Sequence, residues 1–276
     1  MIQKLRSLVR KVGLARLISP WVSRWENWKL SRFGKLETVR LSPDTARISY
    51  GDGKSLQMGP PSHYADMSCS RHELPTLVAF LNVCSGFLDG KVAWDVGGNM
   101  GFYGALLSRL VGPSGKVFGF EPVPDTFKLM CANQQAAHCS NVMPMNIALS
   151  EHDGVMPMSF DPTYNAVSSL EVSAGDAKID VRVASGDRLV ESGECEVPVM
   201  VKMDIEGHEL KALQGMKKTL GRTECRAIVC EIHFSILASR GESDPVGKAK
   251  RLLKEAGFKY CRFISRSHLL ATKDGV

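Results

Sequence analysis

Short apolar runs alternate with amphipathic segments along the chain from residue 91 onward. The apolar runs predict strands at 91–96, 116–121, 142–148, 198–204 and 226–232. The amphipathic segments predict helices at 71–88, 101–111, 124–138, 208–220 and 245–256. A closing antiparallel hairpin is predicted at 258–264 and 267–272. Repeated strand–helix units are typical of a parallel sheet covered on both faces, and ligands of such sheets bind beyond the carboxyl ends of the strands.

The segment before these units has a different pattern. Residues 2–18 carry apolar side chains at helical spacing between lysines and arginines, and Trp21, Trp25 and Trp28 continue one face. The pattern predicts a basic amphipathic helix. It either packs as a cap on the main domain, which we favour, or docks on a membrane surface or a partner.

Two further regions predict short strands. Residues 36–60 contain strand patterns separated by Gly and Pro turns, and strands near 155–160 and 179–184 indicate an insertion into the main domain. We therefore divide the chain into a basic N-terminal extension with short strands, residues 1–60, and a main domain, residues 61–276.

The composition is that of an ordinary globular protein. The chain has 276 residues, of which 44% are hydrophobic and 23% charged, so it can bury a substantial core without disulfides. No apolar run reaches the roughly 18 residues of a membrane span, and we find no secretory signal. The eight cysteines include no Cys-x-x-Cys pair, which favours reduced thiols over a zinc site. We expect a cytoplasmic protein.

The net charge of +6 is unevenly distributed. Residues 1–40 carry +8 and the remainder −2, so the basic charge belongs to the extension. We expect no nucleic-acid partner. If the extension docks on a membrane, residues 1–33 would hold the protein peripherally at the inner membrane surface.

A glycine-rich turn follows the first predicted strand of the main domain. Asp95 lies at the strand end, followed by Gly97, Gly98, Asn99 and Gly101. Glycines allow a ligand to approach the backbone at a helix N-terminus. The spacing differs from the Gly-x-Gly-x-x-Gly of dinucleotide sites, and an acid placed here would repel phosphate while suiting a cationic ligand. The turn therefore favours S-adenosylmethionine over NAD.

The next two strand ends are consistent with an adenosine site. Glu121, at the second strand end, can accept hydrogen bonds from both hydroxyls of a ribose, although it could equally cap the following helix. Asn146 and Ala148, at the third strand end, would lie beside an adenine. A plain buried strand end is nearly as good an explanation of that third segment.

Two later strand ends carry charged side chains. Lys202, Asp204 and Glu206 alternate at the end of one strand, and Glu209 opens the next helix, where acids are favourable. Glu231 and His233 would project on the same side of the following strand. A carboxylate and an imidazole there could form an acid–base pair or a site for a hard metal ion, whereas a structural histidine is the usual alternative.

Five segments, taken in order, resemble the FkbM family of S-adenosylmethionine-dependent methyltransferases. They are Asp95–Gly101, Phe120–Pro122, Asn146–Leu149, Lys202–Glu209 and Glu231–His233. The resemblance covers about residues 90–265. The chain departs from the family around Asp187, which we expect to cap a short helix of its own.

The resemblance implies an α/β class I methyltransferase, or Rossmann-like, fold. Its mostly parallel seven-stranded sheet would be flanked by helices, with a C-terminal antiparallel hairpin and an N-terminal helical extension. It also implies O-methylation of a hydroxyl on a sugar, glycolipid or polyketide-type natural product. Two alternatives remain: an NAD-dependent oxidoreductase, and a non-catalytic cofactor-binding module docked to a membrane or partner.

The resemblance and the motifs together suggest roles for individual residues. The cofactor would be held by Asp95, Gly97, Gly98, Asn99, Gly101, Glu121, Asn146 and Ala148. Asp204 and His233 would position the acceptor and remove its proton, and Glu231 would orient His233. A divalent metal held by Asp204, Glu231 and His233 is compatible with the spacing but not demanded by it.

Overall fold

The computed structural model describes most of the chain beyond the N-terminal extension. The described ranges are 37–42, 45–50, 54–58, 73–84, 87–160, 168–169 and 177–274. The amphipathic helix predicted at 2–18 and the three tryptophans after it lie outside these ranges. None of the described helices is long and apolar enough to cross a bilayer.

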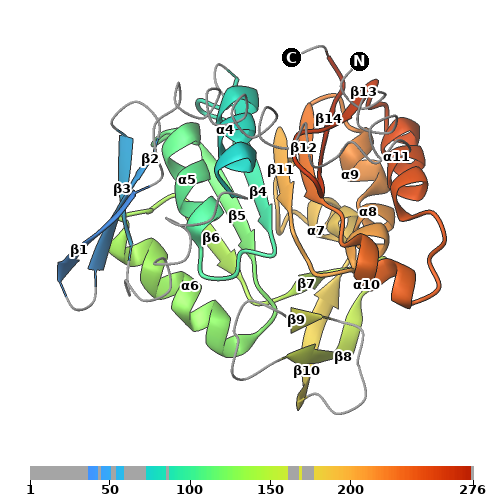
Figure 1. Cartoon of the computed structure of the whole chain (residues 1–276), viewed down its shortest axis with the longest axis horizontal. Helices are drawn as coiled ribbons and strands as arrows, with labels where there is room; N and C mark the ends of the chain where they lie inside the picture. The colour runs from blue at the N-terminus through green and yellow to red at the C-terminus, as the bar shows by residue number, and fades with distance from the viewer. Residues whose placement is uncertain are drawn as a thin grey trace, which may run out of the picture.

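Seven strands form the central sheet (Figure 1). In spatial order they are β13 (Tyr260–Phe263), β14 (His268–Thr272), β12 (Ala227–Glu231), β11 (Met200–Met203), β4 (Val92–Val96), β5 (Lys116–Phe120) and β6 (Val142–Met145). Neighbouring strands are parallel except at β14, which runs antiparallel to both of its neighbours. The predicted class I methyltransferase sheet, with its C-terminal antiparallel hairpin, is confirmed.

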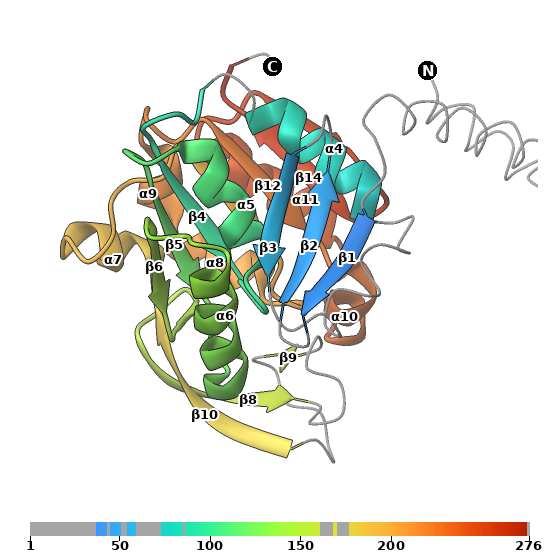
Figure 2. The ribbon, with the colours of Figure 1, turned by 90° about the vertical axis from the view of Figure 1, so that its left-hand side faces the viewer.

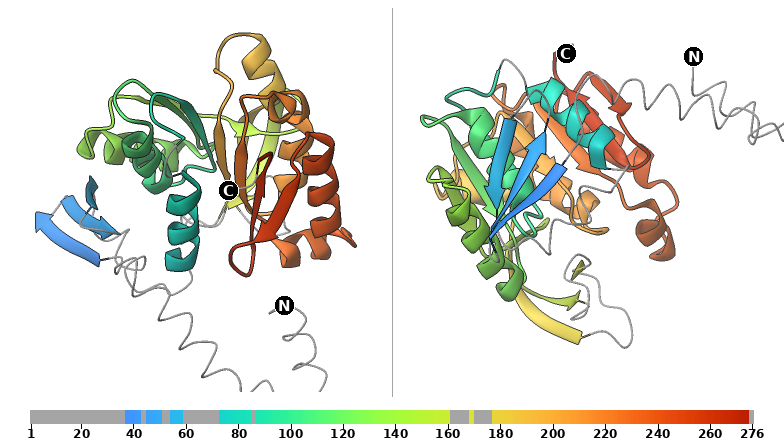
Figure 3. Two further views of the ribbon diagram at one scale, coloured as in Figure 1. Left: turned by 90° about the horizontal axis from the view of Figure 1, so that it is seen from above. Right: turned by 60° about the vertical axis from the view of Figure 1, so that its left-hand side comes forward.

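Helices cover both faces of this sheet, because the strands are apolar on both sides. One face carries α4 (Glu73–Cys84), α5 (Phe102–Val111) and α6 (Pro124–Ala136). The other carries α7 (Gly186–Glu191), α8 (Glu209–Gly215), α9 (Lys217–Gly221) and α11 (Pro245–Glu255). Seen from above, α4 and α11 lie on opposite sides of β14 (Figure 3).

Alternation along β4 separates the two layers of the core. Ala93 packs into the layer with α4 and α5, whereas Trp94 and Val96 pack into the layer with α8 and α11. All three side chains are almost completely buried. The apolar run that predicted this strand is therefore the signature of a strand buried on both faces.

Two smaller sheets flank the central one. β1 (Glu37–Ser42), β2 (Thr45–Tyr50) and β3 (Lys54–Met58) form an antiparallel sheet near α5 and α6 (Figure 2), as the strand patterns at 36–60 predicted. The second sheet has the order β7 (Ala148–Leu149), β10 (Ala177–Ala184), β8 (Gly154–Phe160) and β9 (Ser168–Ser169), and it contains the predicted insertion.

The prediction of one strand over residues 142–148 is wrong for its second half. β6 ends at Met145, and Ala148 pairs instead with Val183 in the second sheet. The side-chain amide of Asn146 donates to the backbone oxygens of Glu121 and Pro122, at 2.8 and 2.9 Å. These bonds anchor the chain at the point where it leaves the central sheet.

The helix predicted at 208–220 is broken at Met216. α9 begins anew after this residue, and the carboxylate of Asp187 accepts from the backbone N–H groups of Lys218 and Thr219, at 2.9 and 2.7 Å. Asp187 therefore caps α9, not its own helix α7, whose N-cap is Ser185. A further helix, α10 (Phe234–Ser239), is not predicted, because six residues are too few to reveal helical periodicity.

Candidate functional site

The loop after β4 is held against the loops that follow its two neighbouring strands. The backbone N–H groups of Gly97 and Gly98 donate to the carbonyl oxygen of Phe120, at 3.0 and 2.8 Å. Gly97 has φ of 83°, and a Cβ built on it would lie 1.9 Å from the carbonyl oxygen of Asp204. Glycine is therefore required here by both the backbone conformation and the close approach of the β11 loop.

Asp95 lies within β4, in register with Lys202 of β11. Its carboxylate is only 1% exposed and accepts a hydrogen bond from the backbone N–H of Gly104 in α5. Among the described residues, none donates to its Oδ2 atom. Burial raises the pKa of Asp95 to about 7 despite the opposing charge of Lys202.

Glu121 joins the loops that follow β4 and β5. Its Oε2 accepts from the backbone N–H of Asn99 and its Oε1 from that of Val123, both at 2.9 Å. Burial raises the pKa of Glu121 to about 7 against these two bonds. Each carboxylate oxygen has a second lone pair, so Glu121 can still accept bonds from a ligand. The predicted cofactor residues thus meet at one edge of the sheet, apart from Ala148, which lies in the second sheet.

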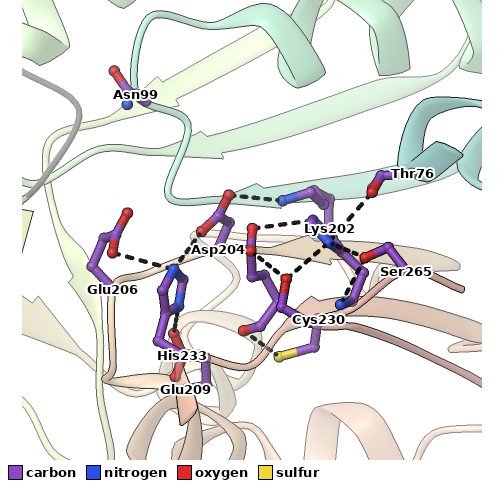
Figure 4. A network of polar contacts seen from close by, with 12 residues as sticks. Thr76, Asn99, Lys202, Asp204, Glu206, Glu209, Cys230, His233 and Ser265 are labelled. Atoms are coloured by element: carbon purple, nitrogen blue, oxygen red, sulfur yellow. Dashed lines mark hydrogen bonds and ion pairs between the residues drawn. The ribbon is translucent and has the colours of Figure 1, made fainter. Parts of the chain in front are cut away.

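The loops after β11 and β12 bring an imidazole among three carboxylates (Figure 4). His233 donates through Nδ1 to Oε1 of Glu209, at 2.7 Å. Its Nε2 lies 3.2 Å from Oε2 of Glu206 and 3.7 Å from Oδ1 of Asp204. The sequence analysis missed these contacts of Glu206 and Glu209. Their acid-rich segment was visible, but only the tertiary structure reveals that both acids face a histidine 24 or more positions away.

The electrostatics of this cluster follow from its burial and its excess of acids. Burial lowers the pKa of His233, but the bond to Glu209 and the charges of the surrounding acids outweigh it and raise the pKa to about 9. Burial also raises the pKa of Glu206 to about 7; the charge of His233 opposes this rise, whereas Asp204 and other acids add to it.

Lys202 supplies positive charge from inside the sheet. It is only 1% exposed, and its Nζ lies 3.3 Å from Oδ2 of Asp204 and 4.7 Å from the ring centre of Tyr103. A buried ammonium group is stable only with such partners. Lys202 thereby links Asp95, on the neighbouring strand, with the acidic cluster.

The expected contact between Glu231 and His233 is wrong. Glu231 pairs instead with Nε2 of His268, at 3.1 Å, and accepts a hydrogen bond from Ser267, at 2.6 Å. Burial raises the pKa of Glu231, but the contacts with His268 outweigh it and hold the pKa well below its usual range. β12 ends at Glu231, and His233 is the N-cap of α10, so the alternation of a continuing strand does not apply. The three residues Asp204, Glu231 and His233 are therefore not brought together; among the described residues, the group whose ligand atoms lie within 4.8 Å of one another is Asp204, Glu206 and His233.

Comparison with protein families gives one match relevant to this site. The model of the methyltransferase FkbM domain matches residues 95–260, which is more than half of the chain. The matched segment runs from Asp95, at the end of β4, to Tyr260, at the start of β13. It therefore contains both the glycine loop and the acidic cluster.

Two curated relatives are similar over about half of the chain. The hexuronic acid methyltransferase AglP of Haloferax volcanii is 37% identical over 148 residues, covering 54% of this chain and 58% of the relative. A protein-L-isoaspartate O-methyltransferase of Caenorhabditis elegans is 28% identical over 153 residues, covering 55% of this chain and 63% of the relative. The chain thus spans less than two thirds of the length of these relatives.

Two solved structures are similar at low sequence identity. The precorrin-6y C5,15-methyltransferase of Geobacter metallireducens is 16% identical, with a TM-score of 0.44, over 73% of this chain and 88% of that one. The fibrillarin of Aeropyrum pernix, determined with bound S-adenosyl-L-methionine, is 11% identical, with a TM-score of 0.42. The similarity covers 86% of this chain and 98% of the fibrillarin chain.

Proposed function

Because the chain belongs to the FkbM methyltransferase family, we propose that it is an S-adenosylmethionine-dependent O-methyltransferase acting on a hydroxyl-bearing acceptor. One observation carries the proposal: the glycine loop of β4 and the Asp204–His233 cluster lie in contact at the same sheet edge. A cofactor bound to the loop would have its reactive end beside a group of polar side chains.

The residues of the glycine loop fit this cofactor. Oδ2 of Asp95 and Oδ1 of Asn99 are buried acceptors that no described residue satisfies. S-adenosylmethionine carries an ammonium group and a cationic sulfur, and it supplies an already activated methyl group when bound. We assign the methionine end to Asp95, Gly97, Gly98, Asn99 and Gly101.

The adenosine end is assigned to the neighbouring loop. Glu121 would accept the ribose hydroxyls with the lone pairs that the backbone leaves free. Asn146 would act mainly by fixing the backbone of Glu121 and Pro122, to which it is already bonded. Ala148 lies in β7, so any contact of this residue with the adenine would have to come from the second sheet.

The acceptor side is assigned to the acidic cluster. Asp204 would accept the proton that the hydroxyl loses on methylation, because its carboxylate is 33% exposed beside the loop. His233, fixed through Nδ1 by Glu209, would hold the acceptor in place with its Nε2 side. Positioning provides much of the rate in such a reaction, since the methyl donor is already activated.

We propose a sugar as the acceptor class, with a hexuronic acid as the first compound to test. The support is the 37% identity to a hexuronic acid methyltransferase, in an aligned region covering 54% of this chain. The competing idea of an NAD-dependent oxidoreductase has no support in the family match. Attachment to a membrane through residues 1–33 remains a separate prediction.

A labelled-methyl transfer assay tests this function. Purified protein is incubated with methyl-labelled cofactor and three acceptor sets: hexuronic acids, neutral glycans and isoaspartyl peptides. We expect label in a sugar fraction, loss of transfer in Asp204→Asn, and normal transfer in Glu255→Gln, a surface change on α11. Binding of NAD without S-adenosylmethionine in a calorimetric titration, or label only in the peptides, would contradict the proposal.

A further inference from the structure

Three side chains at the acceptor side can share one metal ion. Among the described residues, Asp204, Glu206 and His233 each offer a ligand atom, and these atoms lie within 4.8 Å of one another. We propose that they bind a divalent cation, with Mn²⁺ the best match, which in turn holds the acceptor hydroxyl. The role of the cation, unlike its binding, rests on the proposed function.

The distances within the set suit a common ion. Nε2 of His233 is 3.2 Å from Oε2 of Glu206 and 3.7 Å from Oδ1 of Asp204. Ligands about 2.1 Å from an octahedral ion lie about 3.0 Å apart when adjacent and about 4.2 Å apart when opposite. The observed separations fall between these limits, so a cation needs only small side-chain movements to enter.

A buried carboxylate, Glu209, lies behind His233 and is the second observation that supports a metal site. Glu209 is fully buried, and its Oε1 accepts from Nδ1 of His233 and from the backbone N–H of Gly207, at 2.7 and 2.8 Å. Its Oε2 has no partner among the described residues. Metal-binding histidines almost always donate their other nitrogen to such a carboxylate, which turns the free nitrogen towards the ion. Figure 4 shows this arrangement, with Glu209 on one side of the ring and Asp204 and Glu206 on the other.

The charge balance also favours a divalent ion. A cation bound to Nε2 would displace the proton there and leave a neutral imidazole. Asp204, Glu206 and Glu209 then contribute three negative charges, and the neighbouring Lys202 supplies one positive charge. A divalent cation would bring this partly buried group to neutrality. Charged groups removed from water require such compensation.

The ligand types and the exposure indicate which ion binds and what it does. Two carboxylates suit Mg²⁺ and Mn²⁺, and the imidazole shifts the preference towards Mn²⁺. Asp204 is 33% and Glu206 24% exposed, which leaves room for the oxygen of an acceptor as a further ligand. A cation there would lower the pKa of that hydroxyl, and Oδ2 of Asp204, the oxygen that faces Lys202, would take its proton.

Direct binding of Mn²⁺ tests the site without an activity assay. The full chain is stripped with a chelator and titrated with MnCl₂ alone, and free Mn²⁺ is followed by electron paramagnetic resonance. We expect one bound ion per chain. Glu206→Gln and His233→Gln should each abolish binding, and Glu209→Gln should weaken it about 10- to 100-fold through loss of imidazole orientation.

Two control variants test whether Mn²⁺ binding depends on the three proposed ligands and not on acidic residues elsewhere. Glu231→Gln removes a nearby acid that pairs with His268, and Glu255→Gln removes a remote one; both should bind Mn²⁺ as the parent does. Thermal unfolding of every variant checks that the fold persists. Absence of uptake at millimolar Mn²⁺, or binding that survives Glu206→Gln but fails in Glu231→Gln, would overturn the proposal.

The failure of this inference can be told apart from failure of the proposed function. If the stripped protein transfers methyl groups at the full rate in the presence of chelator, the function stands and the cation's role falls. If Mn²⁺ binds as expected but no acceptor is methylated, the metal site stands and the function falls.

Discussion

The affinity for the cofactor should rise as the pH rises from 6 to 7. Asp95 and Glu121 are both buried, and burial raises each pKa to about 7, so both are largely protonated at pH 6 in the free protein. A ligand that donates to these carboxylates prefers their ionised forms. Binding therefore releases protons and becomes stronger with increasing pH.

The size of the effect follows from those pKa values. A carboxyl group with a pKa of about 7 is about one-tenth ionised at pH 6 and half ionised at pH 7, so each group contributes about fivefold to the affinity. The two together contribute about thirtyfold. In the free protein the sign of the stability effect is opposite: the folded state holds more protons than the unfolded state between about pH 4 and 7, so stability falls as the pH rises through that window.

Calorimetric titration with S-adenosylhomocysteine, which cannot react, measures this dependence. Work below pH 7 keeps the amino group of the ligand protonated. Glu121→Gln and Asp95→Asn should each remove about half of the logarithmic slope, and Asp125→Asn, a change at an exposed acid of α6, should leave it intact. Adenosine alone should retain the slope due to Glu121. An affinity that is constant between pH 6 and 7 would refute the reasoning.

Three further predictions concern stability and the extension. Gly97→Ala should cost at least about 2 kcal/mol in denaturant unfolding, because its Cβ would clash with the carbonyl oxygen of Asp204 at a positive φ; unchanged stability would contradict the described loop. Asp187→Ala should lower the free energy of unfolding by about 1 kcal/mol through loss of the α9 cap, and Asp187→Asn should lower it by less; equal losses would argue against capping. Deletion of residues 1–33 should abolish pelleting with anionic liposomes if the extension docks on membranes, and pelleting that persists or never occurs favours a cap.

Strand ends could be predicted from the sequence, but the partners of the side chains there could not. The apolar run before Asp95 is long enough to mark a buried strand, and the glycines after it mark a turn. Asp204 could likewise be predicted as a site residue, because it is a charged residue at the end of an apolar run. The pairing of His233 was missed because a two-residue alternation holds only while a strand continues, and β12 ends at Glu231.

The missed features share one physical cause. Glu209 was expected to open a helix, and it does so as the first residue of α8, but its bond to His233 joins segments that only the pairing of β11 with β12 brings together. The end of β6 at Met145 likewise depends on a side chain, Asn146, that bonds a different loop. The local sequence pattern identifies helices and strands, whereas these tertiary contacts depend on the order of the strands in the sheet.

The sheet order also explains why the two halves of the site lie together. β4 and β11 are neighbours in space but separated by more than 100 residues in the chain, and the N–H of Asp204 donates to the carbonyl oxygen of Val96 at 2.9 Å. The loop that follows β4 and the loop that follows β11 therefore leave the sheet side by side. Gly97 is what allows their backbones to touch. Any larger residue there would separate the glycine loop from the cluster, so under the proposed function this one glycine would set the distance between the bound cofactor and the acceptor.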